Sequence, residues 1–352
     1  MNLKIIKLGL SNFRSIIANN IYLKLGFDFT YPIHVYVQIN SQCNSKCKMC
    51  KIWREDKREL PAAIWINALK EIRPHIGNLK VSFTGGEVLL KKDIFETFEA
   101  CNKENILFGM TTNGILLNKT NIKRFLDLNP FNVNISLDTF NPETYFNIRG
   151  VHCLEKVLAN IEYLVEYRKK INSNILINLK TMVCKENLHE LDKIAEYARE
   201  KNFVGVTYQP LIKETRELET NDESEEMFHI DKKALFHMID KLIEMKRKGY
   251  DILNSEVNMR RWPDYFDGKI VIDRTNPCLV SLRNLYIFPE GDVQLCDYIH
   301  AKVGNIADDN LRSILNSERT AKLKKELVCC KRSCVYCVQR TIKDYITLLS
   351  KF

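Results

Sequence analysis

No uncharged apolar run in this sequence approaches the roughly 20 residues that a membrane-spanning helix needs. We do not expect the N-terminal segment to be a signal peptide, because Lys4, Lys7 and Arg14 interrupt its short apolar stretches and no small-residue cleavage site follows. There is no internal repeat, no low-complexity tract and no long block of lysine or arginine. The net charge of +9 over 352 residues is modest, so we do not expect nucleic acid to be the partner.

Cysteine, in contrast, is plentiful. Of the 12 cysteines, Cys43, Cys47 and Cys50 fall in one short segment, and six others lie between Cys278 and Cys337. Apolar residues (45%) and charged residues (28%) have the proportions of a folded globular protein. Clustered thiols without a secretion signal indicate metal or redox chemistry rather than disulfides. We therefore expect a cytoplasmic protein.

From residue 33 onward, short β-branched segments alternate with helical ones. Strands are expected at 33–39, 79–83, 107–111, 133–137, 175–181 and 204–208. Helices are expected at 61–72, 93–104, 120–128, 154–168, 188–201 and 231–248. This alternation predicts an α/β fold in which helices cover a parallel sheet. Six units over about 180 residues fit a partial (β/α)6 TIM-like barrel or a doubly wound sheet, and are too few for an eight-unit barrel.

The character of the sequence changes near residue 270. Pro263, Gly268 and Pro277 interrupt the helical pattern, and the segments 285–288 and 293–296 flank a turn at 289–292, as in a β-hairpin. A helix is expected at 311–316. We therefore expect an N-terminal amphipathic extension (1–30), the partial barrel (31–270) and a small hairpin-plus-helix domain (271–352) that contains the second group of cysteines.

The first three cysteines, Cys43, Cys47 and Cys50, have C-x3-C-x2-C spacing directly after the first predicted strand. The Asn and Ser residues around them favour a loop, in which three thiolates can converge. A [4Fe–4S] cluster usually takes four thiolates, so three would leave one iron open to a substrate or cofactor, as catalytic zinc sites keep one position open. A zinc site completed by a fourth ligand elsewhere is the alternative.

These cysteines and the segments that follow them resemble the radical S-adenosylmethionine (radical SAM) enzymes. Met49 stands where that family has an apolar residue before the third cysteine, and Gly85, Gly86 and Glu87 are similar to its GGE motif after the second strand. Glycine suits a close approach of backbone to a ligand. The resemblance implies that the three cysteines bind a [4Fe–4S] cluster, that Met49 faces the adenine of SAM, and that Glu87 pairs with the methionine ammonium.

Other matching residues follow later strands. By resemblance, Ser136 would bind the ribose or carboxylate of SAM, while Asn113, Asp138 and Arg149 would line the reaction chamber. Gln209 stands where the family contacts adenine. Simpler interpretations exist for three of them: Asn-Gly is a common turn, Asp138 can cap a helix, and Arg149 can form a surface ion pair.

The C-terminal region resembles the SPASM or the shorter twitch extension of the same family. The resemblance rests on the predicted hairpin and on the cysteines around it, and six cysteines are fewer than a SPASM domain with two clusters needs. It implies one auxiliary [4Fe–4S] cluster bound by Cys278, Cys296, Cys334 and Cys337. Cys330 is the main alternative ligand; Cys329 and Cys330 are adjacent, and consecutive side chains diverge, so both are not expected to bind one cluster. A four-cysteine zinc site is a further alternative.

The resemblance also implies the chemistry: reductive cleavage of SAM gives a 5′-deoxyadenosyl radical, which takes hydrogen from a substrate C–H bond. An auxiliary cluster that accepts an electron favours net oxidation or bond formation on a small molecule (a sugar or aminocyclitol) or a peptide. The alternatives are a radical epimerase, with the thiol of Cys184 as hydrogen donor, and a non-catalytic metal-binding scaffold. We expect a flavodoxin- or ferredoxin-like electron donor.

Residues 1–27 contain four basic residues, no acidic residue and apolar side chains at near-helical spacing. The apolar positions are Leu3, Ile6, Leu10, Phe13, Ile17 and Ile21. A basic amphipathic helix more often packs against its own protein, but it can also lie on an anionic membrane. Peripheral membrane contact would favour a lipid or lipid-linked substrate.

Overall fold

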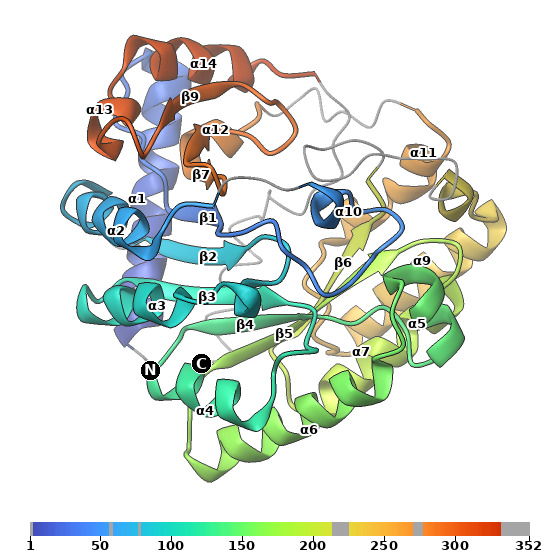
Figure 1. The fold of residues 1–352 in the computed structure, drawn as a ribbon. Coiled ribbons are helices and arrows are strands. Elements are labelled where there is room, and N and C mark those ends of the chain that lie inside the picture. Colours follow the sequence, from blue (N-terminus) through green and yellow to red (C-terminus); the bar gives the residue numbers. More distant parts are fainter. Residues whose placement is uncertain (1–2, 56–58, 77–78, 213–224, 270–276, 332–352) are drawn as a thin grey trace.

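Nine strands form a single sheet in the computed structural model, which describes residues 3–55, 59–76, 79–212, 225–269 and 277–331 (Figure 1). The strand order is β6-β5-β4-β3-β2-β1-β7-β8-β9. The strands are β1 (His34–Gln38), β2 (Lys80–Thr84), β3 (Leu107–Thr112), β4 (Asn132–Ser136), β5 (Leu176–Val183), β6 (Gly205–Pro210), β7 (Asn284–Ile287), β8 (Asp292–Gln294) and β9 (Lys302–Asn305). Pairings from β6 through β1 to β7 are parallel, and the last two are antiparallel.

Helices lie between the parallel strands and cover the outside of the curved sheet (Figure 1). They are α2 (Ala62–Ile76), α3 (Ile94–Lys103), α4 (Lys119–Asp127), α5 (Pro142–Arg149), α6 (Leu154–Lys170), α7 (Leu191–Glu200) and α9 (Lys232–Arg247). Four short single-turn helices join them, η1 (Ile52–Arg54), η2 (Val88–Leu90), η3 (Leu188–Glu190) and η4 (Glu226–Phe228). The remaining helices in the described part of the chain are α1 (Leu3–Leu25), α10 (Glu256–Met259), α11 (Trp262–Phe266), α12 (Val280–Arg283), α13 (Leu311–Leu315) and α14 (Glu318–Val328).

The strand order distinguishes the two architectures that the sequence allowed. A doubly wound sheet reverses its winding direction at a switch point, whereas β1 to β6 follow one another without reversal. The partial (β/α)6 barrel is therefore confirmed. Each of the six predicted barrel strands is present with bounds shifted by at most a few residues.

The two faces of the sheet differ in chemistry. In β1, Val35 and Val37 are buried in the main apolar core with Trp65 and Leu69 of α2. The alternate positions point to the inside of the barrel and are mostly polar, for example Gln38. Parallel strands covered on both faces are usually apolar throughout, so this alternation leaves a polar inner face.

The C-terminal strands extend the barrel sheet. β7 pairs in parallel with β1, with Leu285 opposite Val35, and the predicted hairpin β7–β8 follows. The predicted domain boundary at 270/271 lies outside the described residues, and the sheet is continuous from one predicted part to the other. The predicted helix at 311–316 is present as α13.

Helix α1 runs close to the C-terminal part of the chain, which contains β7, β9 and α14 (Figure 1). The guanidinium of Arg283, which precedes β7, donates to Asn12 Oδ1 at 2.8 Å. After α1, Asp28 forms an ion pair of 2.9 Å with Lys324 of α14. None of the described helices has the length and apolar character needed to cross a membrane.

Candidate active site

The cysteine loop, residues 40–50, follows β1 at its carboxyl end, where parallel-sheet enzymes build their sites. Ser45 N donates to Cys43 Sγ at 3.4 Å, which closes a tight turn. The Cys50 amide donates to the carbonyl of Cys47 at 3.2 Å, and the indole of Trp53 donates to the same carbonyl at 3.2 Å. Hydrogen bonds within the loop and from the residues just after it therefore help to fix its backbone.

The GGE turn after β2 packs directly on the start of this loop. Gly86 N donates to Asn40 O at 3.0 Å, and Glu87 N donates to Gln42 O at 2.7 Å. A Cβ on Gly85 would lie 2.4 Å from Asn40 O, and a Cβ on Gly86 would lie 2.1 Å from Gln42 O. Gly85 also has φ of +140°, which few other residues adopt. Both glycines are therefore required by close backbone packing within the protein itself.

The carboxylate of Glu87 is fully buried and accepts three hydrogen bonds. The donors are Thr112 Oγ1 (2.8 Å), Asn113 N (2.8 Å) and Leu89 N (3.2 Å). Burial raises the pKa of Glu87, and these hydrogen bonds oppose the rise. An ionised carboxylate has about four acceptor positions, so Glu87 keeps capacity for a cation.

Asn113 reaches the cysteine loop. Its Nδ2 lies 2.7 Å from Asn44 Oδ1, 3.2 Å from Ser45 Oγ and 3.9 Å from Cys43 Sγ. Its own Oδ1 accepts from Ile115 N at 3.0 Å, which fixes the amide orientation. A residue expected to line a chamber therefore holds the loop that carries the thiols.

Arg149 reaches the loop from the opposite side. Its guanidinium lies 2.5 Å from Asp138 Oδ2 and 3.8 Å from Cys47 Sγ. The Asp138 side chain is fully buried and accepts from Met182 N at 2.8 Å. Burial disfavours the charged guanidinium, but Asp138 and Cys47 outweigh this and raise the pKa of Arg149. The ordinary interpretation of Arg149 as a surface ion pair does not hold, because the pair is buried.

The backbone around Arg149 supports the same loop. Arg149 O accepts from Lys46 N at 3.0 Å, and Ile148 O accepts from Lys48 N at 3.2 Å. Helix α5 ends at Arg149 and was not predicted, although Asn141 followed by Pro142 is a common helix start. Here Asn141 caps the helix by accepting from Thr144 N.

A small apolar cluster lies beneath the loop. It contains Cys47, Met49, Ile148 and Cys184, with Leu211, Met227 and Phe228. Cys184 is fully buried, and its Sγ lies 3.4 Å from Asn187 Oδ1. Burial and then the nearby acid Glu186 raise the pKa of the Cys184 thiol well above its usual range. This thiol is therefore protonated, and it shares a cluster with a cysteine of the loop.

Ser136 and Gln209 lie on the inner face rather than on the loop. Ser136 ends β4 opposite Lys180, and Gln209 of β6 lies opposite Met182. The structure thus brings together the cysteine loop, the GGE turn, Asn113, Asp138 and Arg149, and places Ser136 and Gln209 near the carboxyl ends of β4 and β6.

The inner face carries a ladder of carboxamides. Asn134 Nδ2 donates to Thr111 Oγ1 at 3.1 Å, and Asn178 Nδ2 lies 3.3 Å from both Asn134 Oδ1 and Thr207 Oγ1. Several buried polar atoms on this face have no hydrogen-bond partner among the described residues, namely both side-chain polar atoms of Gln38, Asn132 Oδ1, Asn178 Oδ1 and Gln294 Oε1. Buried polar groups normally find partners, so this face is suited to a polar ligand.

The three thiols of the loop fit an iron–sulfur cluster, because such clusters are bound by Cys thiolates. Among the described residues, no three Cys, His, Asp or Glu side chains converge closely enough to hold a single metal ion. The thiolates of a [4Fe–4S] cluster bind separate irons, so their sulfurs need not converge in that way. Burial raises the pKa of Cys43 to about 11 and also raises that of Cys47. Metal binding would therefore release protons from the loop.

The second group of cysteines is described in part. Cys278 N donates to Val328 O at 3.2 Å, and burial, together with the neighbouring Cys330, raises the pKa of Cys278. Cys330 is half-buried beside Cys278, whereas Cys329 is exposed. Cys296 follows β8 and packs on the edge of the main core. Cys334 and Cys337 lie outside the described residues.

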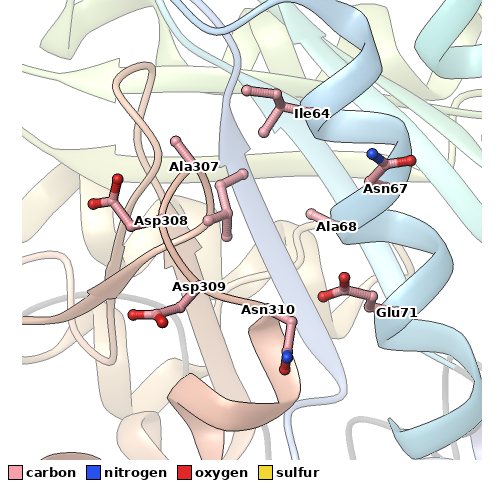
Figure 2. A pocket seen from close by; sticks show the side chains of 9 residues that line it. Ile64, Asn67, Ala68, Glu71, Ala307, Asp308, Asp309 and Asn310 are labelled. Atoms are coloured by element: carbon pink, nitrogen blue, oxygen red, sulfur yellow. The ribbon is translucent and has the colours of Figure 1, made fainter.

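A separate hollow of about 220 Å³ lies between α2 and the loop before α13 (Figure 2). Glu71, Asp308 and Asp309 line it, and Glu71 Oε2 accepts from Leu311 N at 2.8 Å. Glu71 thus accepts a hydrogen bond from one of the backbone N–H groups in the first turn of α13, which have no partner within the helix. The lining contains no cysteine, and we assign it no role in the site.

Sequence reasoning did not assign a role to the residues that form hydrogen bonds to the GGE turn, to Asn113 and to the cysteine loop. Asn40 Nδ2 donates to Glu87 O at 2.8 Å, and Thr112 and Asn44 bond the Glu87 and Asn113 side chains. Glu59 accepts from Ser41 N at 3.1 Å. Asn and Thr at strand ends were the available signal, because these residues favour turns that reach back to the backbone.

Comparison with known proteins agrees with this site. Residues 37–198 match the family model of the radical SAM superfamily, and residues 278–338 match an iron–sulfur cluster-binding (SPASM) domain. The probable GTP 3′,8-cyclase of Methanothermobacter thermautotrophicus is 30% identical over 308 residues, which cover 82% of this chain and 90% of that protein. The probable GTP 3′,8-cyclase of Methanococcus maripaludis is 26% identical over 299 residues, covering 81% and 89%.

Solved structures agree on the fold. Streptococcus suis SuiB bound to S-adenosylmethionine has a TM-score of 0.68 at 17% identity, covering 92% of this chain and 77% of that one. Native anSMEcpe with bound AdoMet and Cp18Cys peptide has a TM-score of 0.61 at 21% identity, covering 85% and 82%.

The fold and the thiol loop define an iron–sulfur enzyme with a partial barrel. With the family matches, the chain belongs to the radical SAM superfamily and carries a C-terminal SPASM-type domain. Its cofactors are S-adenosylmethionine and [4Fe–4S] clusters.

Proposed function

We propose that this enzyme takes hydrogen from a C–H bond of a polar, hydroxyl- or amide-bearing substrate held on the inner face of the barrel, with net oxidation or bond formation as the outcome. When bound, SAM and the reduced cluster supply the radical that performs this abstraction. The observation that carries the proposal is the ladder of carboxamides, with buried Gln38, Asn132 and Asn178 atoms that lack protein partners.

Different residues of the chain would bind the cluster and the parts of SAM. Cys43, Cys47 and Cys50 would bind the cluster, and Met49 would border the adenine. Glu87 would face the ammonium of SAM with its remaining acceptor capacity, held in place by Thr112 and Asn113. Ser136 and Gln209, on the inner face, would contact the ribose or carboxylate and the adenine.

Asn113, Asp138 and Arg149 are positioning residues in this proposal. Each contacts the cysteine loop or a residue that does. The Arg149 guanidinium would stabilise negative charge on the Cys47 thiolate, since it lies 3.8 Å from that sulfur.

The auxiliary cluster would be bound by Cys278 and Cys296, with Cys334 and Cys337 completing the set. The position of Cys330 beside Cys278 supports Cys330 as the alternative ligand. Such a cluster would take an electron from the substrate radical. A flavodoxin- or ferredoxin-like protein would supply the electron for SAM cleavage.

The cofactor assignment is tested by iron and zinc analysis after anaerobic reconstitution. Wild type should hold about eight irons, and the Cys43/Cys47/Cys50→Ala variant about four. A Cys101→Ala variant is the control, because Cys101 lies in the main apolar core and belongs to neither group of cysteines. Zinc in place of four irons would remove the auxiliary electron acceptor.

The substrate class is tested by 5′-deoxyadenosine formation with sugars, aminocyclitols, peptides and GTP, each with deuterium at candidate carbons. GTP is included because relatives are named GTP 3′,8-cyclases, and peptides because one similar structure is SuiB bound to precursor peptide SuiA. Gln38→Leu should raise KM for the accepted substrate with little change in uncoupled SAM cleavage. If only apolar lipids stimulate cleavage, the proposal fails.

A redox-neutral epimerisation is the second candidate, favoured by the buried thiol of Cys184 in the cluster with Cys47 and Met49. The S–H bond would give its hydrogen to the substrate radical, and the sulfur radical left behind would regain one electron from the donor and one proton from solvent. Product formed in D2O would then carry one deuterium at carbon. Cys184→Ala should retain SAM cleavage and lose this deuterium, whereas oxidation would incorporate none.

A further inference from the structure

Helix α1 turns its apolar side to solvent and its polar side to the protein. The buried positions are Ser11, Asn12, Ser15, Ala18 and Asn19. The exposed positions include Leu10, Phe13 and Ile17, spaced at i, i+3 and i+7, with 55%, 62% and 47% of their surface exposed. Helices of globular proteins normally bury their apolar stripe. The orientation of α1 is the reverse.

Contacts at the buried side account for this orientation. Asn12 accepts from the Arg283 guanidinium, itself buried, beside the starts of β7 and β1. The barrel interior is polar, so a helix packed at this end places small and polar residues inward. The apolar stripe is then left without a protein partner among the described residues.

The apolar surface continues beyond the helix. Leu25, Phe27 and Phe29 are 66%, 62% and 63% exposed. Asp28 between the two phenylalanines is paired with Lys324, so its charge is neutralised. A concentration of exposed large apolar side chains in one segment of the chain often marks an interaction site. With 23 residues, α1 is about 35 Å long, so the surface is long and one helix wide.

Charge identifies the partner. The helix contains Lys4, Lys7, Arg14 and Lys24 and no acidic residue, and the Arg14 and Lys24 side chains are exposed. Two copies of such a helix would place like charges together, which disfavours a dimer through this face. A basic helix with Leu and Phe on one side is typical of helices that lie in the plane of an anionic bilayer.

We propose that the outward face of α1, together with Leu25, Phe27 and Phe29, binds the surface of a bilayer that contains anionic phospholipid. The chain would lie on the membrane without crossing it. This inference is independent of the substrate proposed above, because it rests on a surface at the far end of the strands from the cysteine loop.

Sedimentation of the reconstituted full-length protein with vesicles tests the proposal. Wild type should bind vesicles of equal parts phosphatidylcholine and phosphatidylglycerol, more weakly at high salt, and should bind pure phosphatidylcholine poorly. The Leu10→Gln/Phe13→Gln/Ile17→Gln variant should bind at least about tenfold more weakly. Arg14→Gln/Lys24→Gln should reduce the preference for anionic vesicles.

The matched control is Phe236→Gln/Val257→Gln, which removes exposed apolar side chains on α9 and α10 and should leave vesicle binding unchanged. Circular dichroism and SAM cleavage in vesicle-free buffer should be unchanged in every variant, because the substituted side chains are exposed and have no assigned role in the site. Failure of wild type to bind vesicles would overturn the proposal. So would equal binding by the triple variant, or a wild-type dimer that the triple variant abolishes.

Discussion

The buried ion pair between Asp138 and Arg149 provides a sharp test of the reasoning about the site. The perturbation is Asp138→Asn, which removes the charge and keeps an Oδ1 acceptor for the Met182 amide. The Asp138 side chain is fully buried, and that of Arg149 is 13% exposed. The substitution therefore leaves a guanidinium without its partner inside the protein, a loss that costs about 3–5 kcal/mol.

An exposed pair supplies the matched control. Arg260 and Asp240 are also 2.5 Å apart, but their side chains are 49% and 59% exposed. Removing one partner of an exposed pair costs at most about 1 kcal/mol. Asp240→Asn is therefore the same substitution as Asp138→Asn, in an ion pair of the same length. The two pairs differ in how far their side chains are buried.

The assay is urea unfolding of iron-free protein, so that cluster loss does not enter the measured free energy. Asp138→Asn should lower the free energy of unfolding by several times more than Asp240→Asn. The double variant Asp138→Asn/Arg149→Met, which removes the unpaired charge, should recover most of the loss. Equal costs for Asp138→Asn and Asp240→Asn would refute the buried pair and the position of Arg149 beside Cys47.

Three further predictions concern the loop and its supports. In iron-free protein, alkylation of Cys43 by iodoacetamide should be slow at neutral pH, because only the thiolate reacts. The rate should rise about tenfold per pH unit until the pH reaches the Cys43 pKa of about 11. Exposed Cys329 is the fast internal reference, and equal rates for the two cysteines at neutral pH would contradict the burial of Cys43. Gly86→Ala should lower iron per chain after reconstitution, because its Cβ would lie 2.1 Å from a backbone oxygen; a variant with full iron would contradict this packing. Glu87→Gln should reduce SAM affinity, measured by SAM titration, more than it reduces iron content. Thr112→Val should reduce both by less, because it removes only one of the three hydrogen bonds to the Glu87 carboxylate.

Much of the barrel was predictable because its signals are local. The six barrel strands alternate with helices at short spacing, and each strand has its own β-branched run. The pairing of β7 with β1 was not predictable in this way, because it joins Leu285 to Val35 across most of the chain. No local pattern specifies a partner at that separation.

The site was predictable by residue type more than by role. Asn113 and Arg149 were expected to line a chamber, which stays a prediction, and their contacts with the cysteine loop were not foreseen. Side-chain direction after a strand depends on the turn that follows, and two turns with the same residues can direct a side chain differently. The apolar spacing of α1 similarly predicted a helix face at Leu10, Phe13 and Ile17, but periodicity alone does not tell whether that face is buried.

The arrangement explains why residues so far apart in sequence belong to one site. The cysteine loop has little core of its own, and its backbone is held by the GGE turn, by Asn113 and by the end of α5 at Arg149. Glu87 joins two of these supports, since it accepts from the amide of Asn113. A ligand that fixes the Glu87 carboxylate therefore also helps to fix Asn113, whose side chain contacts Cys43. If SAM binds at Glu87 as proposed, SAM binding and iron binding at the loop should be coupled, each strengthening the other, because both order Asn113.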